Sequence, residues 1–124
     1  MREISEGKLE NVAQLLVKLG FPKNPAKTLA CIILSGGKNI RANDVEAATG
    51  LRQPEVSVAV KYLRRSGWIN KNEIKKESKG RPVHTYSLAI SYDRLIDEFN
   101  KILSRRIEQF TGYFEELKKE IMEK

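Results

Sequence analysis

Cysteine and histidine are almost missing from the sequence, and their scarcity excludes two classes of protein. The 124 residues include one cysteine, Cys31, and one histidine, His84. A single thiol cannot form a disulfide within the chain, and these two residues alone cannot build a metal site. We therefore expect neither a disulfide framework nor a bound metal. Cys31 lies in the apolar stretch 29–34, which favours a small core residue over the alternative, a redox-sensing thiol.

Long hydrophobic runs are missing as well. No apolar stretch approaches the roughly 20 residues that a membrane-spanning helix needs. The acidic residues Glu3 and Glu6 stand near the start of the chain, where a secretory signal peptide would be apolar. The sequence therefore predicts a cytoplasmic protein without a membrane partner.

Signatures of catalysis are also lacking. No nucleophile and base stand out as a pair, and neither a glycine-rich phosphate loop nor a carboxylate pair is recognisable. His84 lies in a stretch typical of a β-strand, where we expect an ordinary exposed residue. The prediction is a protein that is not an enzyme and that needs no cofactor.

Positive charge is what the sequence has in excess. Lysine and arginine number 23 against 16 aspartates and glutamates, for a formal net charge of +7, and the isoelectric point is about 9.6. A basic balance favours an anionic partner, either nucleic acid or an acidic membrane surface, although solubility alone also explains it in many proteins. The position of the charge along the chain is therefore more informative than its total.

Hydrophobic spacing predicts four helices in the first half of the chain. Glycine or proline follows each of them and marks its end. In the third helix Asn43 is the expected N-cap, with Glu46 completing a variant of the capping box. The four helices are expected over residues 8–19, 24–34, 42–49 and 54–66.

The character of the sequence changes after Gly67. Residues 68–71 and 83–88 are predicted as the two strands of a hairpin, with a polar tip over residues 75–82. Trp68, Tyr86 and Leu88 are expected to pack this hairpin onto the helices. The fold class predicted from this order is mainly α with a small β-hairpin.

A single long helix is predicted over residues 92–123. Its apolar positions are three or four residues apart, which is typical of a slightly interrupted coiled-coil seam. At 1.5 Å per residue the helix is about 48 Å long, too long for a domain this small to cover. The seam could bury against its own domain, but exposed phenylalanines favour a homodimer joined through residues 92–124. The predicted dimerisation residues are Ile96, Phe99, Leu103, Ile107, Phe110, Phe114, Leu117 and Ile121.

Residues 43–63 are predicted to form two short helices that cross around a tight turn. Gly50 permits a left-handed backbone at the end of the first helix, and Leu51 is expected to plug the turn into the core. In the second helix Val56, Ala59, Val60 and Leu63 recur at i, i+3, i+4 and i+7 and should face inward.

The opposite face of that second helix carries short polar and long basic side chains. A helix in the major groove of DNA presents such side chains to base edges and phosphates, whereas the alternative is a solvated surface. Residues 51–84 hold nine lysines and arginines and three glutamates, a net charge of +6 against +7 for the whole chain. This concentration of charge favours the DNA interpretation.

Three segments carry a resemblance to a known superfamily. Residues 48–57 (ATGLRQPEVS) resemble helix-turn-helix segments of archaeal and bacterial winged-helix regulators of the MarR, ArsR and TrmB-like kind. Residues 62–69 resemble the end of their recognition helix, and residues 79–88, with Gly80-Arg81-Pro82, are similar to the wing of TrmB-like and PadR-like regulators. The resemblance covers residues 25–90. It implies a winged helix-turn-helix DNA-binding domain over residues 1–91 and a role in regulating transcription.

The resemblance also implies roles for individual residues. Val58 stands where many relatives carry arginine or lysine, so a base contact there would be apolar, such as one to a thymine methyl group. Glu55 would either read a cytosine edge or tolerate the nearby backbone. Arg81 corresponds to the wing-tip arginine that enters the minor groove or meets a phosphate. The full set expected to bind DNA is Arg52, Gln53, Pro54, Glu55, Ser57, Val58, Lys61, Arg65, Lys79 and Arg81.

Two function classes remain open at this point. The favoured one is a dimeric regulator that binds double-stranded DNA in a sequence-specific way. The alternative is a winged-helix module that makes protein–protein contacts in transcription machinery. RNA binding is a weaker third interpretation, because aromatic residues are not interleaved with the basic stretch. The sequence identifies no small-molecule effector.

Overall fold

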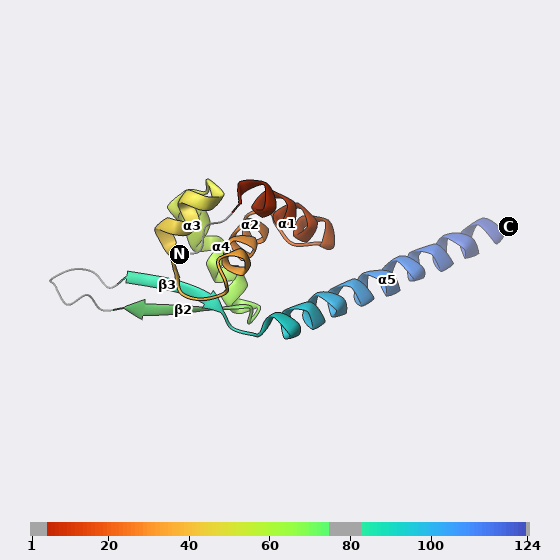
Figure 1. Ribbon diagram of the computed structural model, residues 1–124. Helices are drawn as coiled ribbons and strands as arrows, with labels where there is room; N and C mark the ends of the chain where they lie inside the picture. Colours follow the sequence, from red (N-terminus) through yellow and green to blue (C-terminus); the bar gives the residue numbers. More distant parts are fainter. Residues whose placement is uncertain (1–4, 75–82, 124) are drawn as a thin grey trace. The chain divides into compact units, whose positions relative to one another are not determined.

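The computed structural model describes residues 5–74 and 83–123. Contacts divide the chain into two compact units, Met1–Ile90 and Ser91–Lys124. The first unit contains four helices and a small sheet, and the second contains one long helix (Figure 1).

Four helices build the first unit, and each begins and ends within two residues of the expected bounds. Their apolar faces meet in one core, whose largest fully buried side chains include Leu29, Ile32 and Leu63. Just after the first helix, Phe21 packs edge-to-face on Trp68, with ring centroids 5.5 Å apart. The four helices are α1 (Glu6–Leu19), α2 (Lys23–Leu34), α3 (Ala42–Thr49) and α4 (Gln53–Arg65).

Cys31 is one of the core side chains of α2 and is fully buried. Burial raises the pKa of its thiol from 9.0 to about 11, and the negative charge of Asp44 adds to this effect. Because the thiolate is the reactive form, the thiol stays protonated and inert at neutral pH. The structure therefore favours the core interpretation of Cys31 over the redox one.

The sheet has three antiparallel strands in the order β1-β3-β2. The strands β2 (Ile69–Ile74) and β3 (Val83–Leu88) form the expected hairpin, in which Ile69 pairs with Leu88 and Ile74 pairs with Val83. The third strand, β1 (Ile40–Arg41), pairs with the other edge of β3 and was not predicted. The expectation of a two-stranded hairpin alone is therefore corrected, because two residues are too few to show a hydrophobic period.

The start of α3 also differs from the expectation. The helix begins at Ala42 and its N-cap position is Arg41, whose extended backbone has φ −77° and ψ 153°. Asn43 is inside the helix and is not the cap. The reason is that β1 leads into α3 without a turn, so the last strand residue occupies the N-cap position and makes no side-chain cap hydrogen bond.

The hairpin packs onto the helices through its aromatic residues, as predicted for Trp68 and Tyr86, which are both buried. Burial raises the pKa of the Tyr86 phenol. On the polar side of the sheet, Asn72 donates hydrogen bonds to Asn39 Oδ1 (3.0 Å) and to Ser87 Oγ (3.3 Å). The first bond ties the hairpin to the segment before β1, and the second links the two strands of the hairpin. His84 is exposed, as expected.

The second unit is the helix α5 (Tyr92–Met122), which runs without a break (Figure 1). Ser91 caps it by accepting a hydrogen bond from the backbone nitrogen of Arg94 (3.2 Å). Seven of the eight predicted seam residues are between 44% and 69% exposed, and Phe99 is half-buried. In the described parts of the chain, no helix combines the length and the apolar character needed to cross a membrane.

Two leucines of equal size test the core. Leu63 in α4 is fully buried, whereas Leu15 in α1 is 59% exposed. We expect Leu63→Ala to lower the free energy of unfolding by about 2–5 kcal/mol, because the substitution leaves a cavity. Leu15→Ala should change it by less than about 0.5 kcal/mol. Chemical denaturation of both variants measures the difference, and equal losses would contradict the described core.

Candidate nucleic-acid interface

A turn of three residues between α3 and α4 sets the angle between the two helices. Gly50 has φ +75°, and its backbone nitrogen donates to Glu46 O (2.9 Å). The hydroxyl of Thr49 donates to Val45 O (2.6 Å) and accepts from the backbone nitrogen of Leu51 (3.2 Å). Leu51 is buried as predicted. Thr49 was not predicted to shape the turn, although a threonine hydroxyl that bonds the backbone two residues on is a known turn device.

The helix α4 has a buried face and an exposed one. Val56, Ala59, Val60 and Leu63 are buried, as predicted. The residues directly opposite are Pro54, Val58, Lys61 and Arg65, which are four, three and four residues apart and therefore follow one line along the helix. All four are exposed, as are Arg52, Gln53 and Ser57. The structure thus places seven of the predicted residues on one surface, with Gln53 at its start. We call this surface the outer face of α4.

Glu55 is the exception among the predicted residues of α4. Its Oε1 accepts a hydrogen bond from the backbone nitrogen of Arg52 (2.9 Å), which is half of a capping box. Its Oε2 accepts one from Asn24 Nδ2 at the start of α2 (3.4 Å). The side chain is half-buried. Both carboxylate oxygens therefore have partners within the domain, and the negative charge sits at the positive end of the helix dipole.

The cations near this surface lack carboxylate partners. Within residues 5–74 and 83–123 the ion pairs are both in α5, Lys101–Glu98 (3.2 Å) and Lys118–Glu115 (3.4 Å). Lys61, Arg64 and Arg65 on α4, Arg52 at its N-cap position and Lys71 on β2 are exposed. Unpaired exposed cations on one helix are free to bind an external polyanion.

Two residues predicted to bind DNA, Lys79 and Arg81, lie outside the described residues with the Gly-Arg-Pro segment, and one exposed residue of α4 was not predicted. Tyr62 was not predicted as a site residue, yet it is 41% exposed beside Val58 on α4. The signal was its spacing of four residues from Val58.

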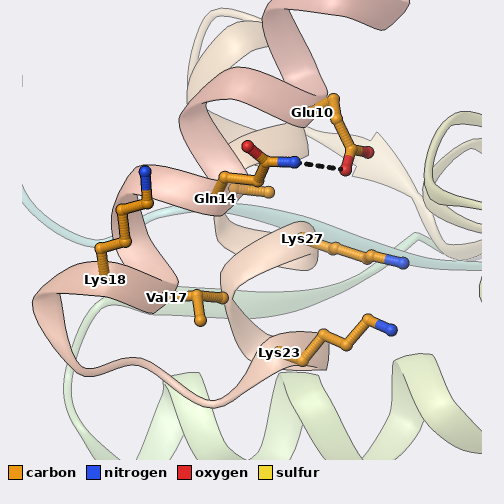
Figure 2. A pocket seen from close by; sticks show the side chains of 7 residues that line it. Glu10, Gln14, Val17, Lys18, Lys23 and Lys27 are labelled. Carbon is orange, nitrogen blue, oxygen red and sulfur yellow. Dashed lines mark hydrogen bonds between the residues drawn. The ribbon is translucent and has the colours of Figure 1, made fainter.

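A hollow with a volume of about 300 Å³ lies between α1 and α2. Figure 2 shows Val17 in it, with Lys18, Lys23 and Lys27 around it and Gln14 donating to Glu10 (3.2 Å). Its lining includes no residue of α4 or of the hairpin, so it is separate from the outer face of α4. The described residues also hold no group of His, Cys, Asp and Glu side chains suited to a metal.

No protein-family profile matches the chain, and no curated protein sequence matches it. Solved structures match its fold. A possible transcriptional regulator from Methanosarcina mazei Go1 is 16% identical, with a TM-score of 0.63 over 88% of each chain. A mutant of S. aureus MepR bound to an oligodeoxyribonucleotide is 19% identical, with a TM-score of 0.53 over 93% of this chain and 86% of that one.

TrmBL2, an archaeal chromatin protein with a novel mode of DNA binding, is 10% identical, with a TM-score of 0.59 over 92% of this chain and 40% of TrmBL2. At these identities the likenesses concern the fold. Together with the element order they show a winged helix-turn-helix fold with a long C-terminal helix.

Glu55 offers a test of how the start of α4 is held. Glu55→Ala should lower the free energy of unfolding by about 1 kcal/mol, because the Arg52 amide and Asn24 lose their acceptor. Glu55→Gln should retain most of the stability, since glutamine also accepts at this position of a capping box. Thermal unfolding of the two variants measures the difference. Equal stability of Glu55→Ala and the unchanged protein would mean that the capping box is not needed.

Proposed function

We propose that this chain is a transcriptional regulator that binds double-stranded DNA in a sequence-specific way as a homodimer. The observation that carries the proposal is the outer face of α4. Exposed cations without acidic partners lie there on the second helix of a helix-turn-helix. The fold is shared with a MepR mutant that was solved bound to an oligodeoxyribonucleotide. The proposed activity is binding and involves no catalysis and no cofactor.

In this proposal α4 lies in the major groove. Its N-terminal end, with Gln53 and Ser57, reaches base edges, because recognition helices of this class approach the bases with their N-terminal residues. Lys61 and Arg65 lie one and two turns further along and meet phosphates. Arg52 belongs to the same surface, and Lys79 and Arg81 contact the backbone or the adjacent minor groove. Glu55 acts indirectly, by holding the start of α4.

The helix α5 is the proposed dimerisation element. Its exposed seam contains Phe110, Phe114 and Leu117 in the second half of the helix, each more than half exposed. An apolar stripe of this length on an isolated helix is unfavourable in water, and a second copy of the same helix would cover it. Two copies would present two outer faces of α4 to a site with two halves.

Selection from a random pool of duplexes by the purified protein tests the function. A DNA-binding regulator enriches a shared sequence, and its affinity falls as salt rises. A protein that retains no duplex at low salt would instead be a protein–protein module, which is the alternative interpretation of the same fold.

Lys61 and Gln53 separate the two kinds of contact that we propose. Lys61→Ala should weaken binding to all duplexes alike and lower the slope of log affinity against log salt by about one, because one phosphate contact is lost. Gln53→Ala should cost about 1–3 kcal/mol on the selected duplex and relax the preference at one base pair. Lys18→Ala, which removes the same charge from α1, is the control. Fluorescence anisotropy titrations at several salt concentrations measure these effects, and variants indistinguishable from Lys18→Ala would remove this face from the interface.

Phe114 tests the proposed dimer in the full-length chain. Phe114→Asp places a charge in the seam and should shift the protein from dimer to monomer, whereas Gln109→Asp adds the same charge to an exposed position off the seam and should leave the dimer intact. Sedimentation velocity over a range of concentrations measures both. A monomeric unchanged protein, or a dimer that survives Phe114→Asp, would contradict dimerisation through this seam.

A further inference from the structure

The outer face of α4 contains an apolar strip beside its cations. Pro54, Val58 and Tyr62 are four residues apart and therefore adjoin one another along the helix. Val58 is 70% exposed and Tyr62 41% exposed. Among the described residues of the first unit, Val58 is the most exposed large hydrophobic side chain. We call these three residues the apolar strip.

Neither folding nor solubility accounts for Val58. An exposed valine gains nothing from packing, and its branched Cβ makes it a poorer helix former than lysine, arginine or alanine. The four core residues of α4 are already in place on the buried side. Folding of the domain therefore does not require valine at position 58, where any helix-forming residue would fit. A contact with a partner explains the valine better.

The surroundings of Val58 restrict the chemistry of that contact. Arg52, Lys61 and Arg65 lie on the same face, so the partner presents negative charge around an apolar group. Valine has no hydrogen-bond donor or acceptor and cannot read the polar edges of bases. In the major groove the one apolar group on base edges is the 5-methyl group of thymine.

We propose that the apolar strip, with Val58 at its centre, reads thymine methyl groups and makes them a determinant of the preferred site. This inference rests on the proposed DNA-binding function and adds the chemical feature that is recognised. Pro54 and Tyr62 extend the same surface one turn to either side, so neighbouring thymines contribute together. The apolar strip then contributes sequence preference through thymine methyl groups, and the adjacent cations contribute affinity through phosphates.

Replacing thymine by uracil isolates the methyl group, since uracil keeps the same base pairing and the same O4 acceptor. We would compare a random duplex pool made with thymine and one made with uracil, and then substitute single thymines in the selected duplex. At each contacted position we expect the thymine-to-uracil change to lower affinity about fourfold. This corresponds to the loss of roughly 0.8 kcal/mol for one buried carbon group. The unchanged protein should therefore prefer the thymine pool.

Variants at position 58 link any such preference to the strip. Val58→Ala should weaken binding to thymine duplexes and reduce the difference between thymine and uracil at the position that Val58 contacts, because the smaller methyl side chain buries less of the thymine methyl group. Val58→Lys should bind both duplexes, which shows that it is folded, and should not distinguish them. Val17→Ala makes the same change as Val58→Ala at an exposed valine of α1 and should keep the full difference.

The outcomes separate this inference from the function on which it rests. Equal binding of thymine and uracil duplexes by the unchanged protein overturns methyl reading while leaving DNA binding intact. A thymine preference that both Val58→Ala and Val58→Lys keep at its full size assigns the contact to another part of the protein and also overturns the inference. Failure to bind any duplex overturns the proposed function together with it. A preference reduced or lost at position 58 and kept in Val17→Ala supports it.

Discussion

The packing of α4 against α2 is the constraint on which the rest of the first unit depends. Fully buried side chains from both helices, such as Leu29, Ile32 and Leu63, belong to the same core. A helix whose inner stripe is fixed in this way cannot rotate, so its other residues are directed outward in a set order. The hydrogen bond between Asn24 and Glu55 ties the start of α4 to the start of α2 as well. The side chains of the outer face of α4 are therefore held on a rigid base.

The helices could be predicted from the sequence because their hydrophobic period repeats over several turns. The inner stripe of α4, the glycine at the end of α3 and the exposed seam of α5 are all local patterns of this kind. Contacts between distant parts of the chain have no such pattern. Strand β1 has two residues and depends on pairing with β3, and Glu55 depends on Asn24, which is 31 residues away.

In the candidate site, too, features set by local spacing could be predicted and features set by a specific contact could not. Most of its predicted residues do share one exposed surface, since helical spacing alone places them there. The capping contact of Glu55 could not be predicted, because a glutamate on a surface helix looks the same in sequence whether it faces solvent or caps the helix. The prediction of Asn43 as the N-cap was wrong for a related reason. Asparagine is a preferred N-cap residue, but in this helix it lies one residue inside the first turn and the N-cap position is Arg41. Tyr62 was not predicted as a site residue, because in sequence an aromatic residue near the end of a helix is as typical of the core as of an exposed surface.

The two units divide the proposed work. The first positions a helix for contact with DNA, whereas the second offers a long apolar seam to a second copy. A seam of eight apolar residues, only slightly interrupted, favours pairing over most of the length of α5 and makes the pairing tolerant of single conservative changes. Specific recognition then depends on a few side chains of α4, each of which is exposed to solvent in the single chain.

The absence of ion pairs in the described part of the first unit has a consequence for how such a protein can diversify. The cations of α4 are held by no carboxylate, so the domain does not need them in order to fold. Exchanging them costs little stability, and relatives built on the same core are free to acquire new binding preferences one surface residue at a time. In the proposed function, a scaffold whose fold and whose recognition use separate residues can change its target DNA while its stability stays nearly constant, because surface substitutions change the free energy of unfolding little.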